Sequence, residues 1–559
     1  MIMKKITIKA FLAGFFALGL VSCSDELNIT SIDPQSDASY DATQLLAKQY
    51  ATLGLTGQTG PSGNGDTSGD EGEIGFYRVV FNLEELCTDE VAWAWQTDDD
   101  IPALTYIRWT SSSTRAYWAY QRLAYNITLY NSYLSEMSDS GDPQYLAEVR
   151  FLRALNYYYF LDLFRKAPFK DTFSISELPV EKAGVDLYNW IDEELTDIES
   201  SLAGVGEFCN STNFGRADRG AAYALHARLA LNSSVYTEGT VQDYQKAIDY
   251  CDKIINSGAY ELSTATKNGY SGYEQVFMGD NDENSQAMKE IIFPIRQDGT
   301  KTESYAGSTY LVASCRIAGM PYCNTTNYWS CNFARYSMVQ KFFDDPESQC
   351  PIATEAAPSG ATEAETIALD EAAGTSTTDV IAAAGDDRAL FYTGCGGGVR
   401  SFTTSQITSF INGLSIVKWS NVHSDGGARH DDTFMDTDIP LFRLGEIYMT
   451  RAEAYYRLGQ ISNAWSDLMV IRNRANASTI TESDVTEDFL IDEWCRECYM
   501  EARRRSDLVR FGRFSGSTYI WPFKGGVAAG TGVESYYDIY PIPADDIALN
   551  PNMTQNPGY

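Results

Sequence analysis

Apolar side chains recur at intervals of three and four residues along several stretches of the chain, which is the spacing of one face of an α-helix. Residues 444–458 follow this pattern up to Gly459, and residues 462–476 repeat it after a short turn. Alanines on both stretches allow two helices to approach each other closely. We therefore predict a helix-turn-helix pair in this part of the chain.

Two further pairs are predicted by the same pattern, at 219–236 with 243–260 and at 113–137 with 144–165. Repeated helical hairpins rich in Ala, Leu and Tyr are typical of tetratricopeptide units, although the spacing here is too irregular for a clean repeat array. A short apolar run at 290–295 indicates a strand. The predicted fold is mainly α: a tetratricopeptide-like helical hairpin scaffold with long loop-rich and minor β embellishments.

The segments between the helices differ in composition. Residues 54–75 are rich in Gly, Ser and Asp, and residues 261–332 combine many aromatic side chains with little helical pattern. Residues 351–385 are biased to Ala, Thr and Glu and are expected to form an exposed excursion, and the Pro- and Asn-rich end cannot form a long helix. Long loops on a rigid scaffold are where ligands usually bind, so we expect a loop-rich binding region around 54–110 and 261–332.

The first 22 residues have the layout of a signal peptide, with a basic start and a short apolar run. Leu20-Val21-Ser22-Cys23 resembles the lipobox of bacterial lipoproteins, in which Cys23 becomes the acylated first residue. The acidic start at 24–26 resembles the surface-export signal of Bacteroidetes lipoproteins. The alternative is an ordinary secretory signal in which the cysteine is incidental.

The formal net charge of the 559 residues is −34. Such a charge argues against nucleic acid, whose phosphates need basic partners, and against acidic glycans or direct adsorption to anionic lipid. It is compatible with neutral ligands.

Nucleophilic and metal-assisted catalysis find little support. The chain has three histidines and no G-x-S-x-G or H-E-x-x-H motif, but its 76 acidic residues leave a glycoside hydrolase open as an alternative. Of the eleven cysteines, Cys495 and Cys498 form a C-x-x-C inside a helical pattern. A bridge between two of Cys315, Cys323 and Cys331 is a further option in an exported protein.

Two groups of oxygen-bearing side chains suit a hard cation such as calcium. One group is the run from Asp280 to Asn284, and the other is Asp436-Thr437-Asp438. A solvated acidic loop and a helix N-cap explain these residues equally well on their own.

The segment TDEVAWAWQTDDD at 88–100 places Trp93 and Trp95 two residues apart between acidic side chains. Residues two apart in a strand share one face. A segment this acidic is not expected in the deep core, so the two tryptophans are expected near the surface.

Four motifs are similar to the SusD/RagB family of outer-membrane nutrient-binding lipoproteins: EVRFLRALNYYYFLDLF at 148–164, PLFRLGEIYMTRAEAYYRLG at 440–459, EARRRSDLVRFGRF at 501–514 and the terminal YPIPADDIALNPNMTQNPGY. Segments at 75–78, 88–96, 294–312 and 318–331 resemble the starch-binding members of that family. The resemblance implies one domain over 23–559 and no catalysis. It also implies capture of starch or maltooligosaccharides at the cell surface for a SusC-type TonB-dependent transporter.

The resemblance also implies site residues. An aromatic arc falls on Trp93, Tyr305 and Trp329, and polar partners to sugar hydroxyls fall on Asp70, Arg78 and Asp98. Trp95 is expected to support this platform rather than to contact sugar. Asp98, Tyr322 and Cys323 depart from the starch-binding pattern, so another neutral glycan remains an alternative ligand. A calcium ion is implied at Asp282, Asn284, Asp436 and Asp438.

Overall fold

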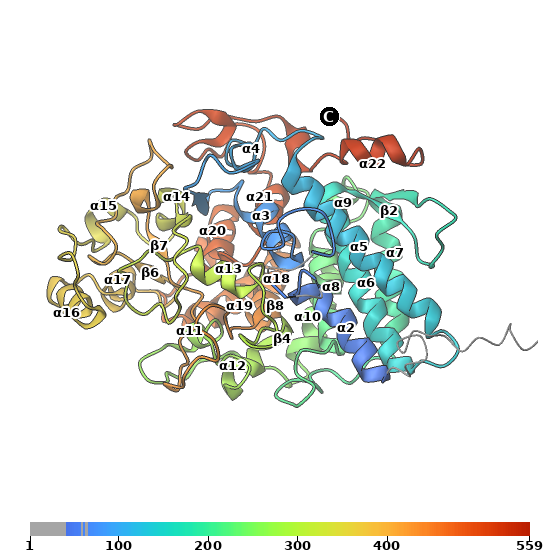
Figure 1. Cartoon of the computed structure of the whole chain (residues 1–559), viewed down its shortest axis with the longest axis horizontal. Helices are drawn as coiled ribbons and strands as arrows, with labels where there is room; N and C mark the ends of the chain where they lie inside the picture. The colour runs from blue at the N-terminus through green and yellow to red at the C-terminus, as the bar shows by residue number, and fades with distance from the viewer. Residues whose placement is uncertain (1–40, 58–59, 62–64) are drawn as a thin grey trace, which may run out of the picture. The chain divides into compact units, whose positions relative to one another are not determined.

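Helical hairpins form the scaffold of the protein, as the sequence pattern predicts (Figure 1). The structure, a computed structural model, describes residues 41–57, 60–61 and 65–559. The chain divides into two units, Met1–Lys48 and Gln49–Tyr559. The second unit contains the hairpins and every predicted site residue other than Cys23.

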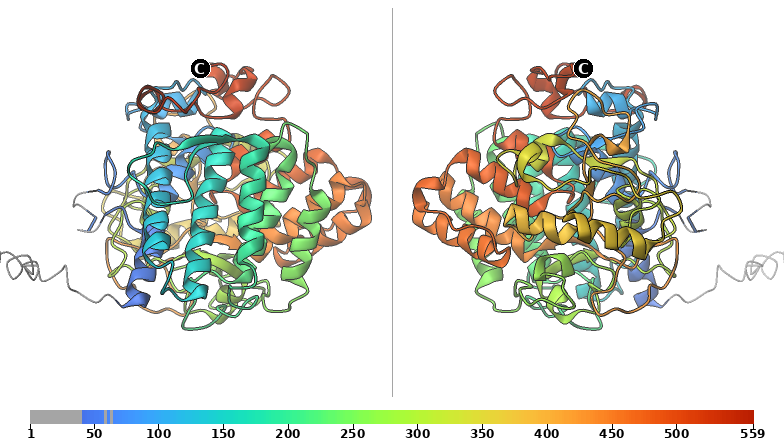
Figure 2. Two further views of the ribbon diagram at one scale, coloured as in Figure 1. Left: turned by 90° about the vertical axis from the view of Figure 1, so that its right-hand side faces the viewer. Right: turned by 90° about the vertical axis from the view of Figure 1, so that its left-hand side faces the viewer.

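The predicted hairpins are present close to their predicted bounds. They are α5 (Thr114–Glu136) with α6 (Pro143–Phe164), α8 (Arg219–Leu231) and α9 (Ser233–Tyr236) with α10 (Tyr244–Ile255), and α18 (Leu444–Arg457) with α19 (Ile461–Arg474). Together with α7 (Gly184–Ile198), these helices pack in the order α5, α6, α7, α8, α10, α18, α19 (Figure 2). The prediction of a mainly α, tetratricopeptide-like scaffold is confirmed.

Helix α6 shows how local sequence sets the bounds of a scaffold helix. The carboxylate of Asp142 accepts a hydrogen bond from the N–H of Gln144, and Pro143 occupies the first turn, where a missing N–H does no harm. The helix ends where Arg165 adopts φ 59°. Nearly every residue from Ala147 to Phe164 is buried, which explains why this helix is apolar almost all round.

Short helices and turns fill the segments between the hairpins. They are α2 (Ala42–Gly54), α3 (Phe76–Glu85), α4 (Ile101–Thr105), α11 (Gly272–Gln275), α12 (Ser285–Glu290), α13 (Ser308–Ala313), α14 (Tyr336–Val339), α15 (Pro346–Gln349), α16 (Glu363–Ala373), α17 (Thr377–Ala384), α20 (Glu487–Cys498), α21 (Arg504–Arg510) and α22 (Ala544–Leu549). The six-residue α22 confirms that the end of the chain forms no long helix. None of the described helices has the length and apolar character needed to cross a membrane.

The β structure of the described residues consists of antiparallel two-stranded pairs. They are β1 (Val91–Trp93) with β5 (Asn332–Ala334), β2 (Lys166–Phe169) with β3 (Val180–Ala183), β4 (Ile291–Ile295) with β8 (Ile439–Arg443), and β6 (Phe391–Tyr392) with β7 (Ser415–Ile416). Strand β4 confirms the predicted strand at 290–295.

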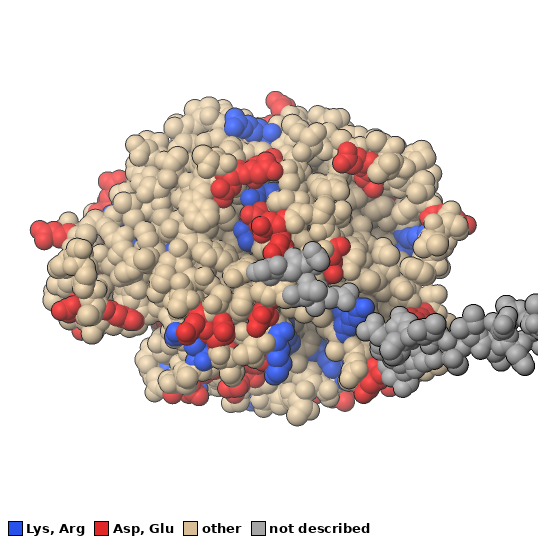
Figure 3. Space-filling view, viewed as in Figure 1, with Lys and Arg blue, Asp and Glu red and all other residues tan. Residues whose placement is uncertain are grey.

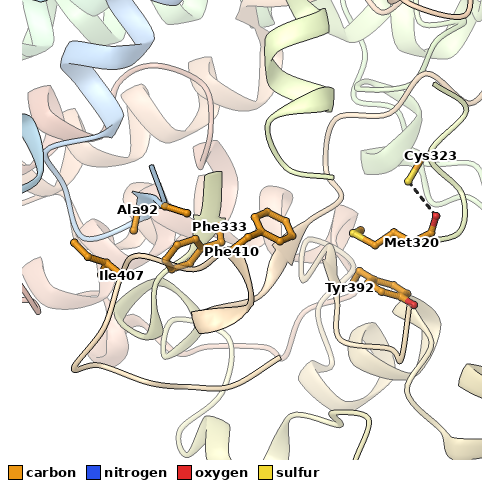
Figure 4. Close-up of a cluster of buried hydrophobic side chains, with 8 residues drawn as sticks. Ala92, Met320, Cys323, Phe333, Tyr392, Ile407 and Phe410 are labelled. Carbon is orange, nitrogen blue, oxygen red and sulfur yellow. Dashed lines mark hydrogen bonds between the residues drawn. The ribbon is translucent and has the colours of Figure 1, made fainter. Parts of the chain in front are cut away.

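A buried apolar cluster supports the pair formed by β1 and β5. Ala92 of β1 is paired with Phe333 of β5, and both belong to this cluster. In Figure 4, Phe333 and Phe410 lie between Ala92 on one side and Met320 on the other. The cluster therefore joins β1 to the loop that follows α13, and these are two parts of the predicted binding region.

The expectation that the acidic segment at 88–100 avoids the core is wrong for its first half. Asp89 and Glu90 are buried, because the chain supplies a buried cation to meet them. Arg504 donates from Nε and Nη2 to the two oxygens of Asp89, each at 2.8 Å. A buried charge pair of this kind is tolerated when both partners are hydrogen-bonded. Asp89 therefore neutralises Arg504 of the EARRR motif.

Acid should weaken this core contact. Burial alone would raise the pKa of Asp89, but the guanidinium of Arg504 holds it well below its ordinary value. Because the pKa of Asp89 is lower in the folded than in the unfolded protein, its ionised form stabilises the fold. This stabilisation is complete above about pH 4 and is lost as the pH falls toward the pKa of the folded protein. We expect the contribution of Asp89 to lower the free energy of unfolding by about 2 kcal/mol as the pH falls from about 6 to 2. Urea unfolding across that range measures the drop.

The matched variant is Asp89→Asn, which keeps the shape of the side chain and removes its titration. Its unfolding free energy should be lower at neutral pH and should change less with acid than that of the wild type. An equally steep acid dependence in the variant would contradict this assignment.

The segment 351–385 is an exposed excursion, as predicted, but it contains two regular helices. Thr362 and Glu365 form a capping box at the start of α16, and Ser376 and Asp379 form one at the start of α17. Only Thr366 and Asp370 of α16 are buried. All ten cysteines of the described residues are free, so the structure contains neither a bridge among Cys315, Cys323 and Cys331 nor one between Cys495 and Cys498.

Candidate functional site

The two tryptophans of the 88–100 segment differ sharply in exposure. Strand β1 ends at Trp93, whose side chain is 2% exposed, whereas Trp95 lies beyond the strand and is 44% exposed. Their rings meet edge to face, with centroids 6.1 Å apart. Of the two rings, Trp95 is therefore the accessible one, whereas Trp93, the ring that the resemblance places in the arc, is buried against it. Residues two apart share a face only within a strand, and β1 ends at Trp93, so the rule does not apply to Trp95.

Trp93 is held by contacts on several sides. Its ring stacks on that of Tyr310 of α13 with centroids 5.9 Å apart, and its Nε1 donates to Asp98 at 3.0 Å. The guanidinium of Arg115 lies 5.8 Å from the ring centroid. Asp98 is partly exposed and spends one carboxylate oxygen on Trp93, so that oxygen orients a ring rather than a ligand.

Arg78 of α3 lies where several rings meet. Its guanidinium is 4.3 Å from the ring centroid of Tyr310, 5.8 Å from that of Trp93 and 6.0 Å from that of Trp329. It donates to the carbonyl of Gly72 and, at 3.2 Å, to Glu73, and only 5% of the residue is exposed. Arg78 therefore joins the rings to the loop that carries Asp70.

Asp70 and Tyr305 approach Arg78 around Gly72. Asp70 is exposed and accepts the N–H of Gly72 at 2.8 Å. A Cβ atom at Gly72 would lie 3.0 Å from Oδ1 of Asp70, 3.3 Å from Cβ of Tyr305 and 3.7 Å from Nη1 of Arg78. A side chain at this position would crowd Asp70 and Tyr305 and contact Arg78, so the glycine allows these residues to lie close together. These residues lie up to 235 positions apart in the chain (Asp70 and Tyr305).

Tyr305 and Trp329 complete a series of ring contacts. Their centroids are 6.0 Å apart, and Phe434 packs against Tyr305 at 5.1 Å. Trp329 also lies 6.5 Å from Tyr310, so ring contacts run without a break from Trp95 through Trp93, Tyr310 and Trp329 to Tyr305. We call the more accessible members the exposed ring set: Trp95, which is exposed, and Tyr305 and Trp329, which are partly exposed. The structure brings the predicted arc together, with Trp95 in place of Trp93 at the surface.

Sequence reasoning missed four residues that hold this arrangement: Glu73, Arg115, Tyr310 and Phe434. Glu73 forms ion pairs with Arg78 at 3.2 Å and with Arg115 at 2.5 Å, which fixes both guanidinium groups beneath the rings. Tyr310 and Phe434 are buried at 0% and 9% exposure and resemble ordinary core aromatics in the sequence. Only their contacts in three dimensions identify them as supports.

Two of the four predicted calcium ligands, Asn284 and Asp436, make hydrogen bonds within the protein. Asn284 caps α12 with its side-chain oxygen and donates to Gln275 at 2.9 Å, away from the carboxylates. Asp436 accepts from His423 at 3.1 Å and from His430 at 3.0 Å. No group of three or more His, Cys, Asp or Glu in the described part of the chain is arranged to hold a metal.

Arg296 stands between the other two carboxylates. Its Nη2 is 2.6 Å from Oδ2 of Asp282, and its Nε is 2.8 Å from Oδ2 of Asp438. The second contact is an ion pair without hydrogen-bond geometry, since that oxygen has no hydrogen-bond partner within the described residues. Burial raises the pKa of Asp438 well above its usual value, against the lowering effect of Arg296. In this arrangement, Arg296 is the cationic partner of both carboxylates.

The predicted signal peptide and the predicted acylation site at Cys23 lie outside the described residues.

Comparison with known proteins decides the family. A protein of Bacteroides thetaiotaomicron named starch-binding protein SusD is 52% identical over 99% of this chain and 99% of its own length. The chain belongs to the SusD family. The SusD family model itself matches residues 392–559, and a SusD-like protein P25 of Formosa agariphila is 22% identical over 75% of this chain and 73% of its own length.

Solved structures of the SusD superfamily share the fold. One from Bacteroides thetaiotaomicron aligns over 92% of this chain and 99% of its own with a TM-score of 0.64 at 18% identity. Surface glycan-binding protein A of the same species, in complex with laminarihexaose, aligns over 92% and 98% with a TM-score of 0.62 at 17% identity. Two of these relatives are named for binding starch or glycan, and the 52% identical one is a binding protein, in agreement with the prediction of a non-catalytic protein.

Proposed function

We propose that this protein binds α-1,4-glucan, as starch or maltooligosaccharides, without catalysis. The observation that carries the proposal is the exposed ring set beside Arg78, Asp70 and Asp98, in a chain 52% identical to a protein named for starch binding. The faces of pyranose rings carry C–H groups that pack against flat aromatic side chains, while carboxylate and guanidinium groups meet the hydroxyls. A ligand held in this way needs no charge.

The charge of the protein agrees with a neutral ligand. Acidic side chains are scattered across the face shown in Figure 3, and basic ones are gathered mainly in its lower part. With a net charge of −34, the protein as a whole would repel an anionic glycan. Another neutral glycan is the remaining alternative within the same function.

Affinity electrophoresis of a form that starts after Cys23 tests the proposal. Native gels containing starch, a β-linked glucan or no glycan should retard the protein in starch alone, and a reducing-sugar assay should detect no product. Retardation in the β-linked glucan alone would identify that glucan, and not starch, as the ligand. Release of reducing ends would support the hydrolase alternative instead.

A lipid anchor and a membrane partner complete the proposed role. Acylation of Cys23 would hold the protein at the outer membrane, facing the cell surface, where it would deliver glycan to a SusC-type TonB-dependent transporter. Co-purification of such a transporter with the tagged protein from solubilised outer membranes tests the partner.

The variant Cys23→Ala should abolish anchoring, because a lipobox without its cysteine offers no thiol for acylation. After detergent phase partitioning, wild-type protein should enter the detergent phase and the variant the aqueous phase. The variant should be tested in cells lacking the transporter, because the partner would otherwise retain it. A variant that still partitions into detergent would contradict the lipoprotein assignment.

A calcium ion at Asp282, Asp436 and Asp438 is a separate proposal, which requires Arg296 to leave its present position. An ion that binds the native state alone stabilises that state by mass action. A chelator should then lower the melting temperature by a few degrees, and added calcium should restore it. The variant Arg296→Gln should enlarge the calcium response, since the guanidinium no longer competes. No response in either protein would show that Arg296 is the cation that serves these carboxylates.

A further inference from the structure

Two exposed tyrosines lie in the loop between α13 and β5, which also carries Trp329 of the exposed ring set. Tyr322 is 47% exposed and Tyr328 is 39% exposed. Within the described residues, neither hydroxyl makes a hydrogen bond and neither ring packs against another ring. We call them the tyrosine pair. Large exposed rings leave apolar surface in water, and such surfaces often mark binding sites.

The loop that carries the pair is held rigidly. Met320 and Cys323 are anchored in the buried cluster of Figure 4, and Pro321 between them is buried as well, whereas the side chain of Tyr322 is exposed. Thr326 and Asn327 bond to the backbone carbonyls of Asp432 and Thr433 at 2.9 and 2.8 Å. The loop that carries the two rings is thus ordered before a ligand binds. Less conformational entropy is lost on binding, which favours affinity.

The backbone of this loop also carries strain. Tyr322 has φ 59° and Asn324 has φ 43°, and a bulky residue such as tyrosine rarely adopts the left-handed region. The N–H of Tyr322 donates to Glu363 of α16 at 2.9 Å, and Asn324 donates to the carbonyl of Asn421 at 2.6 Å. Strained backbone that the surrounding structure holds in place is concentrated at functional sites.

Acidic groups surround the pair. Burial, then Glu371, Asp370, Tyr270 and Glu363 raise the pKa of Tyr322, and burial, Cys323 and Glu363 raise that of Tyr328. Both phenols are therefore neutral at physiological pH and can donate as well as accept hydrogen bonds. The nearby carboxylates favour a ligand rich in hydroxyl donors and disfavour an anionic one.

We propose that the tyrosine pair is a second glycan-contact surface, which extends the exposed ring set and takes the continuation of the same neutral glucan chain. Tyr328 directly precedes Trp329 in the chain, so the tyrosine pair and a member of the exposed ring set are carried by the same loop. The extension rests on the proposed function. It assigns preference for long glucans to these two residues and leaves binding of short ones to the exposed ring set.

Calorimetry with maltotriose and with a long soluble α-1,4-glucan tests this assignment. In the double variant Tyr322→Asn/Tyr328→Ala, the affinity for the long glucan should fall about five- to tenfold, while the affinity for maltotriose stays within about twofold. Asparagine is chosen at 322 because it tolerates positive φ. Unchanged maltotriose binding also shows that the variant is folded.

Two further variants serve as controls. The variant Tyr322→Phe/Tyr328→Phe keeps both rings and should retain most of the affinity for long glucan, whereas Tyr456→Ala on α18, a partly exposed tyrosine elsewhere, should change nothing. Wild-type affinity for long glucan in the ring-less variant would overturn the extension, and so would an equal loss for both ligands. A wild-type protein that binds neither ligand would contradict the proposed function itself, and the extension with it.

Discussion

Replacing Trp95 and Trp329 together by alanine should remove measurable starch binding while the protein stays folded. One face of a ring on a sugar contributes about 1 kcal/mol or slightly more by the area argument, so each single variant should weaken binding roughly five- to tenfold. When both rings act on one ligand, the two losses combine to a decrease of about 25- to 100-fold. Because such binding starts in the micromolar to millimolar range, a decrease of that size moves the Kd to about 0.1 mM or weaker, where retardation in a starch gel is largely lost.

Native electrophoresis in starch gels measures the loss, and circular dichroism checks the fold. Trp465→Ala on α19 is the matched control: this tryptophan is partly buried, and its Nε1 donates to the carbonyl of Ile480 at 2.8 Å, within the helical scaffold. It should migrate like the wild type. If the double variant is still retarded as strongly as the wild type, the exposed ring set is not the starch-binding surface.

Replacing Trp93 by alanine should instead destabilise the protein by about 3–5 kcal/mol, the usual cost of emptying a buried aromatic site. The ring is 2% exposed, stacks on Tyr310 and satisfies Asp98 through its Nε1, so its removal leaves a cavity and an unpaired acceptor. A lower melting temperature and a lower urea midpoint would show the effect. Binding should weaken as well, because Trp95 loses the ring against which it stands.

Trp95→Ala is the control for this second prediction, since it removes an exposed ring from the same loop and should leave the melting temperature nearly unchanged. Trp93→Phe should fall between wild type and Trp93→Ala, because it keeps part of the stacking and loses the hydrogen bond. A variant Trp93→Ala with wild-type stability and lost binding would instead make Trp93 the sugar-facing ring, as the family resemblance implies.

The scaffold could be predicted from the sequence because its signals are local. Periodicity at three and four residues located the hairpins at 113–165, 219–260 and 444–476 to within a few residues, and Gly459 marked the turn inside the last of them. Capping and periodicity depend on neighbours in the chain, which a sequence displays directly. Composition likewise located the exposed excursion at 351–385.

The family resemblance identified the site segments, but only the tertiary structure decided which side chains face the solvent. Trp93 and Trp95 have the same sequence environment, yet the end of β1 and the packing of Tyr310 bury one and expose the other. The acidic residues beside them divide in the same way, because Asp89 meets Arg504 from 415 positions away in the core, while Asp98 stays partly exposed. Likewise, Arg296 reaches Asp282 and Asp438 in the place predicted for calcium. Burial and charge pairing depend on contacts between distant parts of the chain, and a local pattern contains no record of them.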